Sequence, residues 1–350
     1  MSMPKISIDI EKKYRFIQQI GQGSFGKVYL VLNKEDGKKY ACKVENKTPK
    51  TKNRLKGEAN IYKHYISKKI VCVPEYHAYI ETTDNNMLMM QLLGKSLDGI
   101  FEDCDNSIDT GTVMKIGITI IRHLETIHRS GFIHRDIKPN NFMFGTNDDK
   151  NTLYVMDFGL SKKWCIYDKE TGELNHIPYK SGRSMIGTAR YASLNVHLGT
   201  EPSRRDDMES VGYMLIYLIK GVLPWQGLKK KTKENQIDKI GEKKMMVDLG
   251  ELCKGMPKCF YEYVKYTRGL QFADKPDYDH MVNLFETSAK KEGINMEYYW
   301  VRENIPEQPA ILQSNDEKDP YTNQENNENV IDRKKKSTIR TKKNIRNKNS

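Results

Sequence analysis

Two short motifs place four polar side chains where they could carry out a reaction together. The motif His-Arg-Asp-Ile-Lys-Pro-Asn-Asn contains Asp136, Lys138 and Asn141, and the motif Asp-Phe-Gly, about twenty residues later, begins with Asp157. A carboxylate such as that of Asp136 can accept a hydrogen bond from an attacking hydroxyl and orient it. Lys138 can neutralise charge on a transferred group, and the oxygens of Asn141 and Asp157 are ligands that Mg²⁺ prefers. Together the motifs predict transfer of a phosphoryl group from Mg-ATP to a hydroxyl.

A glycine-rich segment precedes these motifs and suits a nucleotide. Dinucleotide-binding folds share its Gly-x-Gly-x-x-Gly pattern, but there a helix follows the glycines, whereas here a segment of high β-propensity follows. Backbone amides between glycines can approach phosphates closely because no Cβ obstructs them. An ordinary glycine-rich hairpin is the alternative. The predicted nucleotide-binding residues are Ile20, Gly21, Gln22, Gly23, Ser24, Phe25 and Gly26, with Val28 covering the adenine ring.

A lysine and a glutamate follow at spacings that resemble the third strand and the next helix of protein kinases. Ala41-Cys42-Lys43 matches Ala-x-Lys, and its lysine lies seventeen residues after the last glycine. We expect Lys43 to contact the α- and β-phosphates of ATP and to pair with Glu58 on the helix behind it. Met90 is expected behind the adenine and Leu93 in the linker that follows. A solvated lysine and an ordinary core strand are the alternatives.

The composition predicts a soluble protein. The 350 residues are 37% hydrophobic with a mean hydropathy of −0.73, and no apolar run approaches the roughly 18 residues of a membrane span. The first residues lack the apolar region of a secretory signal. Six scattered cysteines without a Cys-x-x-Cys pair argue against a disulfide framework or a zinc site, so we expect reduced thiols. We therefore expect a cytoplasmic protein that could also enter the nucleus.

The net charge of +12 is mostly a property of the last twenty residues. Residues 331–350 contain nine Lys or Arg and one Asp, which gives +8 and leaves +4 for the preceding 330 residues. Residues 303–328 are rich in Asn, Gln, Glu and Pro, so they cannot bury enough apolar surface to offset the entropy of ordering. We predict a disordered tail over 303–350 that is basic from residue 333.

The spacing of apolar residues changes along the chain from that of strands to that of helices. Alternation and β-propensity predict strands at 15–20, 27–32 and 39–45, and an apolar run predicts another at 87–93. Asp36-Gly37 predicts a hairpin turn before the third strand. Helical spacing predicts helices at 54–65, 112–129, 205–220, 259–269 and 278–292.

Several further segments resemble one family of protein kinases. Most protein kinases close the activation segment with Ala-Pro-Glu, whereas this chain has Ser193-Leu194-Asn195, similar to the Ser-Ile-Asn of casein kinase 1. The resemblance implies an α+β, bilobal protein kinase domain over residues 14–300. Its N-terminal lobe, about 14–92, would be an antiparallel β-sheet plus one helix, and its C-terminal lobe, about 93–300, mainly helical. Further matching segments are residues 92–97, 187–192, 203–210 and 223–228.

The resemblance implies an ATP- and Mg²⁺-dependent Ser/Thr protein kinase. Members of the family are usually active without phosphorylation of the activation segment and favour protein substrates that are acidic or already phosphorylated upstream of the target. By resemblance, Thr188 bonds near Asp136 and helps to select the hydroxyl, and Asp207 anchors the catalytic loop. Two positions depart from the family, since Asn140 replaces the usual Asp and Gln91 the usual Glu.

Basic residues in and after the activation segment predict a patch for the substrate's acidic or phosphorylated group. Lys180 and Lys233 fall where casein kinase 1 places phosphate-recognition residues, and Arg183 lies between them in the sequence. Arg135 is a further candidate partner for an anion in the activation segment. Solvated surface charges are the alternative for each of them.

Two other functions stay open. A pseudokinase scaffold usually lacks one of the lysine, base or metal positions, whereas Lys43, Asp136, Asn141 and Asp157 are all present. The basic tail could attract nucleic-acid phosphates, but it has no aromatic residues for base stacking, and a localisation or docking signal, or a solvated tail without function, fits it too. We expect a monomer that binds protein substrates, no membrane, and nucleic acid only through the tail.

Overall fold

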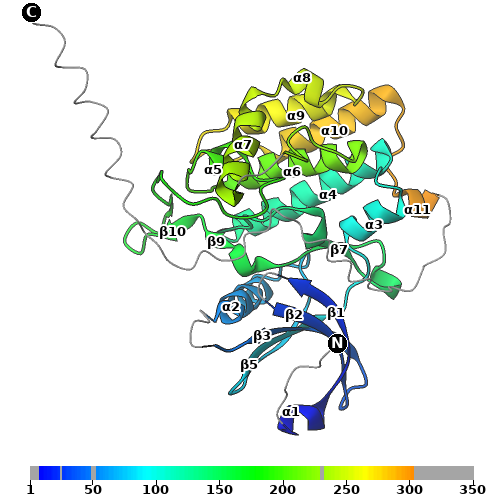
Figure 1. Cartoon of the computed structure of the whole chain (residues 1–350), viewed down its shortest axis with the longest axis vertical. Coiled ribbons are helices and arrows are strands. Elements are labelled where there is room, and N and C mark those ends of the chain that lie inside the picture. Colours follow the sequence, from blue (N-terminus) through cyan, green and yellow to red (C-terminus); the bar gives the residue numbers. More distant parts are fainter. Residues whose placement is uncertain (1–7, 24–25, 49–52, 229–231, 303–350) are drawn as a thin grey trace, which may run out of the picture.

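A small lobe built on a β-sheet packs against a larger helical lobe (Figure 1). The computed structural model describes residues 8–23, 26–48, 53–228 and 232–302. The tail over 303–350, which was expected to be disordered and basic, lies outside the described residues, as do Ser24 and Phe25 of the glycine-rich segment. The predicted fold class, α+β with two lobes, is confirmed.

The N-terminal sheet has five antiparallel strands in the order β1-β2-β3-β5-β4. At the turn between β2 and β3, Asp36 Oδ1 accepts a hydrogen bond from Lys38 N at 2.8 Å, the local bonding that makes Asp common in turns. A short helix, α1 (Ile8–Lys13), precedes the sheet. The strands are β1 (Tyr14–Gly23), β2 (Gly26–Asn33), β3 (Lys39–Asn46), β4 (Tyr76–Glu81) and β5 (Asn85–Gln91).

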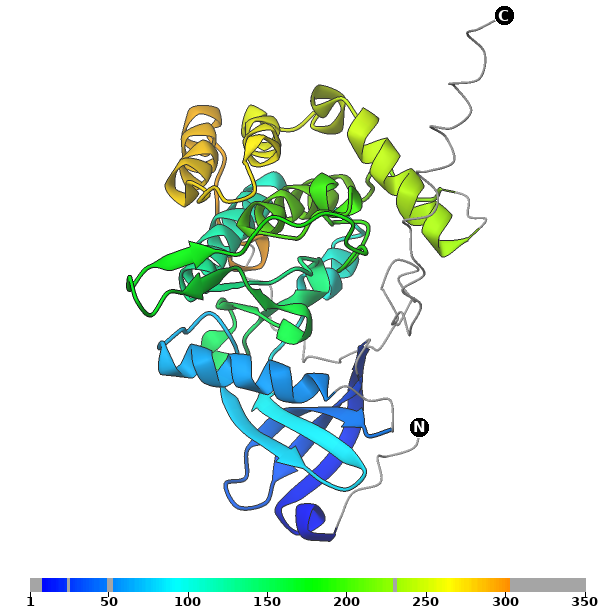
Figure 2. The same cartoon turned by 90° about the vertical axis from the view of Figure 1, so that its left-hand side faces the viewer.

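The side chains of the central strands β3 and β5 point alternately into two hydrophobic clusters, one on each face of the sheet. Because side chains alternate along a strand, Leu88 and Met90 enter the main core, whereas Met87 and Met89 enter a smaller cluster on the other face. Helix α2 (Arg54–Ser67) packs on the main-core face against β4 and β5. Figure 2 shows α2 between the sheet and the helical lobe, where it can contact both.

Helix α6 (Arg204–Lys220) is the centre of the helical lobe and is buried over almost its whole length. Helices α4 (Thr110–Arg129) and α9 (Lys258–Gly269) pack against it, and α10 (Tyr278–Glu292) packs against both of these. A capping box of Ser203 and Asp206 begins α6. The other helices of the lobe are α3 (Leu97–Asp103), α5 (Leu194–His197), α7 (Lys233–Met246), α8 (Leu249–Leu252) and α11 (Tyr299–Arg302).

Short strands and 3₁₀ turns make up the segment of the helical lobe between α4 and α5. β6 (Phe132–Ile133) pairs with β9 (Lys162–Lys163), and β7 (Phe142–Phe144) pairs with β8 (Leu153–Val155). The hairpin of β10 (Cys165–Tyr167) and β11 (Leu174–His176) extends from the helical lobe (Figure 1). The 3₁₀ turns are η1 (Pro139–Asn141), η2 (Asn147–Asp149) and η3 (Phe158–Leu160).

The predicted strands and helices agree with the structure in type, and most of their bounds differ by one to three residues. The strand expected over 87–93 ends at Gln91, because Gly94 N donates to Phe144 O at 2.8 Å and draws the chain towards the helical lobe. Helix α2 runs two residues past its expected end. All six cysteines are free thiols. In the described ranges, the helices are too short or too polar to cross a membrane.

Candidate active site

Lys43 on β3 lies between two carboxylates from distant parts of the chain. Its Nζ is 2.8 Å from Glu58 Oε2 on α2 and 2.9 Å from Asp157 Oδ1, directly before η3. The sheet register sets Lys43 opposite Val28 on β2 and Leu88 on β5. The expected pair of Lys43 and Glu58 is formed, and Asp157 joins it.

Burial and charge act in opposite directions on these three groups. Burial raises the pKa of Glu58 to about 7, although the Lys43 cation opposes it. Burial alone would raise the pKa of Asp157 too, but the cations of Lys43 and Lys138 lower it to about 2. Burial alone would lower the pKa of Lys43, but the carboxylates of Asp157 and Glu58 raise it. At neutral pH the site therefore holds a charged lysine and an ionised Asp157.

Asp136 is held by a lysine on one oxygen and a threonine on the other. Lys138 Nζ lies 2.9 Å from Asp136 Oδ2, and Thr188 Oγ1 donates to Asp136 Oδ1 at 2.7 Å. Asn141 Nδ2 donates to the backbone carbonyl of Asp136 at 2.8 Å, so its Oδ1 can face another partner. The structure thus brings Thr188 to the catalytic loop although it lies 52 residues beyond Asp136.

Asp207 on α6 anchors the loop that carries Asp136. Its carboxylate accepts the backbone N–H groups of His134 at 2.7 Å and Arg135 at 2.8 Å, and His128 Nε2 lies 2.9 Å away. These two backbone bonds hold Arg135 at a left-handed φ of +70°, which non-glycine residues seldom adopt. The anchor expected from Asp207 is therefore present.

Phe158 joins the segment after Asp157 to helix α2 and to the catalytic loop. Its ring centroid lies 5.3 Å from that of Tyr62, 4.9 Å from that of Tyr65 and 5.3 Å from that of His134. Aromatic pairs at these distances attract one another beyond the burial of their area. Because α2 also carries Glu58, this packing fixes both carboxylates around Lys43.

The apolar residues expected around adenine lie on one face of the sheet. Ala41 and Met90 oppose each other on β3 and β5 and are buried in the main core. Ile20 and Val28 are partly buried against the same core, and Leu93 is 3% exposed after the end of β5. This face of the sheet is therefore apolar beside the Lys43 cluster.

The glycine-rich segment forms the end of the β1–β2 hairpin. Residues 21–23 pair with residues 26–28 across it. At Gly26 a Cβ would collide with the carbonyl of Val44 on β3, so only glycine lets β2 pass so close. Residues 24–25 lie outside the described residues.

A comparison of the whole sequence with family models identifies the family of this domain. The model described as "Protein kinase domain" matches residues 14–266. That stretch contains every charged side chain of the site above. The chain belongs to the protein kinase family. It is therefore a phosphotransferase, and the kinase domain implies ATP as the phosphoryl donor, typically with Mg²⁺.

The kinase residues fit Mg-ATP by their own chemistry. Asp157 is ionised at neutral pH, and Asn141 keeps an amide oxygen because its nitrogen donates to the carbonyl of Asp136. A carboxylate and an amide oxygen are hard ligands of the kind that Mg²⁺ takes. The Lys43 cation, close to Asp157, can face the phosphates.

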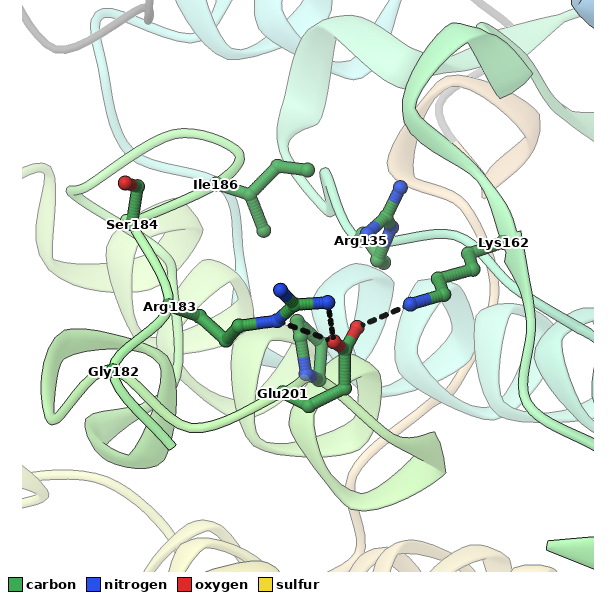
Figure 3. Close-up of a pocket in the computed structure, with 8 residues that line it drawn as sticks. Arg135, Lys162, Gly182, Arg183, Ser184, Ile186 and Glu201 are labelled. Carbon is green, nitrogen blue, oxygen red and sulfur yellow. Dashed lines mark hydrogen bonds and ion pairs between the residues drawn. The ribbon is translucent and has the colours of Figure 1, made fainter. Parts of the chain in front are cut away.

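A cationic pocket of about 340 Å³ lies beside the catalytic loop of the kinase (Figure 3). Arg135, Lys162 and Arg183 contribute three cations to its lining, and Glu201 contributes one carboxylate. Lys162 Nζ and Arg183 NH2 each lie 2.7 Å from an oxygen of Glu201, and Figure 3 shows them reaching it from opposite sides. The pocket therefore keeps an excess of positive charge.

Of the patch predicted from Lys180, Arg183 and Lys233, the structure places the side chain of Arg183 in this pocket. Lys180 accepts a bond from Glu201 N through its backbone carbonyl at 2.8 Å. Lys233 begins α7, and its side chain lies outside the described residues. Sequence reasoning missed Lys162 and Glu201, because a lysine or a glutamate outside a motif carries no signal in a chain that is 30% charged.

Proposed function

We propose that this protein kinase phosphorylates Ser and Thr hydroxyls and is of the casein kinase 1 type. The observation that carries the proposal is the hydrogen bond of 2.7 Å from Thr188 Oγ1 to Asp136 Oδ1, with Lys138 on the other oxygen. These contacts fix the carboxylate that would orient the acceptor hydroxyl. The Ser193-Leu194-Asn195 segment supports the casein kinase 1 type.

Each polar residue of the site has one task in this proposal. Asp136 accepts a hydrogen bond from the hydroxyl and aims its oxygen at the γ-phosphorus. Asn141 and Asp157 would hold Mg²⁺, which when bound neutralises phosphate charge. Lys43 and Lys138 neutralise charge on the nucleotide and on the transferred group. Since the transition state is loose, positioning and charge stabilisation supply most of the catalysis.

We also propose that the kinase prefers substrates with an acidic or phosphorylated group near the target hydroxyl. The excess of cations in the pocket of Arg135, Lys162 and Arg183 supports this preference. Arginine and lysine form charge-assisted bonds with phosphate oxygens, which are about twice as strong as neutral ones. The pocket and Asp136 share the segment 135–136, so one peptide could contact both.

Labelling of casein with radioactive ATP tests the activity, and phosphoamino-acid analysis tests the choice of hydroxyl. Asp136→Asn should reduce labelling about 100-fold or more, because the amide cannot accept the proton. Asp84→Asn, which changes an exposed carboxylate between β4 and β5, should label like the wild type. Equal labelling by the Asp136 and Asp84 variants would contradict the proposal, as would label on tyrosine alone.

Paired peptides with and without an upstream phosphoserine test the substrate preference. Lys162→Met should raise KM for the phosphorylated peptide about tenfold, the loss of one charge-assisted contact, and should leave KM for the other peptide unchanged. An equal change for both peptides would mean that the pocket does not select phosphate.

A further inference from the structure

Lys244 on α7 is a completely buried lysine, 0% exposed, whose side-chain nitrogen is held by backbone carbonyls. Nζ donates to Ala189 O at 2.8 Å and to Ala192 O at 2.6 Å, and it lies 3.2 Å from His197 Nε2. The rings of Tyr213 and Trp225 lie 5.1 and 5.0 Å from the same nitrogen. Burying a lysine costs free energy unless its N–H donors find partners. The two carbonyls are therefore the partners that allow Lys244 to be buried.

The two carbonyls belong to one tight turn that begins at Thr188. Tyr191 N and Ala192 N both donate to Thr188 O at 3.0 Å. The side chain of the same threonine donates to Asp136. A donor that bridges Ala189 O and Ala192 O therefore fixes the turn from which Thr188 reaches the active site.

The same turn is held a second time from the same side. Trp225 Nε1 donates to Arg190 O at 2.7 Å, and His197 Nε2 lies 3.1 Å from Ala189 O. Helix α7 packs on α5, which follows the turn directly (Figure 1). The carbonyls of the turn thus bond to the helical lobe, while its threonine bonds to the catalytic loop.

We propose that Lys244 is a positioning residue that sets Thr188 against Asp136 by holding the carbonyls of Ala189 and Ala192. The inference rests on the proposed function, in which Asp136 orients the acceptor hydroxyl. It does not depend on the charge of the lysine, because a neutral amine keeps two N–H donors and the two carbonyls need two. Without Lys244 the turn can shift, and a shift of about 1 Å at a reacting group can cost about 100-fold in rate.

A double-mutant cycle separates positioning from a general stabilising role. Lys244→Met should lower kcat for a casein peptide about 10- to 100-fold and leave KM for ATP unchanged, since Lys43, Asn141 and Asp157 are untouched. Thr188→Ala should lower kcat as well. In the Thr188→Ala background, Lys244→Met should cost no more than about threefold, because residues that act through one contact are not additive.

The inference is overturned if Lys244→Met lowers kcat as much in the Thr188→Ala background as it does in the wild-type background. It is also overturned if the folded Lys244→Met variant keeps the wild-type kcat. If Lys244→Met does not fold, Lys244→Gln serves instead. Its amide donors stop one atom short, so it should show a smaller kcat loss that again vanishes without Thr188. Failure of the proposed function would look different, because Asp136→Asn and Thr188→Ala would then leave phosphorylation unchanged.

Lys220→Met is the matched control. Lys220 Nζ also donates to a backbone carbonyl, that of Leu252, at 2.8 Å. Its bond joins the end of α6 to α8 and does not touch the turn at Thr188. Lys220→Met should keep the wild-type kcat, and circular dichroism should show each variant folded at the assay temperature.

Discussion

Two buried lysines, one in each lobe, are held in opposite ways. Lys43 sits between the carboxylates of Glu58 and Asp157, which raise its pKa. Lys244 sits among backbone carbonyls, and burial lowers its pKa. The side chain of Asp157 is 31% exposed, whereas Lys244 is closed off completely.

The difference shows that the same side chain can serve as a charge or as a pair of donors. Lys43 pairs with Asp157, which is ionised and partly exposed, so it can face the phosphates of a ligand. Lys244 has neutral partners and no exposed surface, so it can hold the turn but cannot meet a ligand. Substitution of the first lysine should therefore damage chemistry most, and substitution of the second should also damage stability.

The largest effect is expected from Lys43→Met. We expect kcat/KM for phosphorylation to fall about 100- to 1,000-fold, the size of losing one group that stabilises transition-state charge. Lys39→Met, at an exposed position of the same strand, is the control and should stay active. Steady-state kinetics with varied ATP would measure this, and a Lys43 variant with more than a third of wild-type activity would break the comparison.

An intermediate effect is expected on the pH dependence of stability. Because the pKa of Lys244 is lowered in the folded state, this lysine binds more protons in the unfolded state at pH values below about 10.5. The contribution of Lys244 to the unfolding free energy therefore rises as pH rises towards 10.5. The raised pKa of Lys43 means that its stabilisation is complete below pH 10.5 and is lost only above it. Lys244→Met should therefore flatten the rise between about pH 7 and 9.5.

Urea unfolding at several pH values in this interval provides the measurement. Lys39→Met, which removes an exposed lysine of β3, should keep the wild-type slope of unfolding free energy against pH. Lys244→Met should also lower the unfolding free energy by a few kcal/mol at neutral pH, because two buried carbonyls lose a donor at about 1–3 kcal/mol each. Equal slopes in the wild type and the Lys244 variant would contradict the claim that burial lowers the pKa of Lys244.

The smallest effect is expected from Asn53→Ala at the start of α2. Asn53 Oδ1 accepts bonds from Lys56 N at 3.2 Å, Tyr79 OH at 3.0 Å and Asn86 Nδ2 at 3.1 Å. We expect a loss of about 1 kcal/mol of unfolding free energy, as for other helix N-caps. A fall of a few-fold in activity should accompany it, because α2 carries Glu58.

Asn53→Gly separates the loss of the side-chain bonds from the backbone strain that alanine would introduce at this position. The residue has a left-handed φ of 38°, which glycine adopts without strain. The glycine variant should therefore lose less stability than the alanine variant in thermal unfolding. If both keep wild-type stability, the three bonds to Asn53 do not hold α2.

The part of the site that short motifs encode was predictable from sequence. The pair of Lys43 and Glu58 was expected from the spacing of a strand and a helix, and the structure forms it. The contact of Thr188 with Asp136 was expected from the family resemblance and is also formed. The long helices were predictable for a similar reason, since the spacing of their apolar residues is local.

Contacts between distant residues without a motif were not predictable. Lys244 lies 55 residues from Ala189, and the polar sequence of α7 concealed a helix with a fully buried lysine. Lys162 and Glu201 pair across 39 residues. In each case only the packing of the helical lobe brings the partners together, and no local pattern records it.

The carboxylate of Glu201 already pairs with two cations of the pocket. Its side chain is 3% exposed and bonded to Lys162 and Arg183, which together lower its pKa against the effect of burial. A peptide anion would therefore enter as a competitor for cations that already have a tethered carboxylate. A single carboxylate can compete with Glu201, but a phosphate competes better, because it brings close to two charges and three oxygens. We therefore expect the pocket to bind a phosphorylated residue more tightly than an acidic residue.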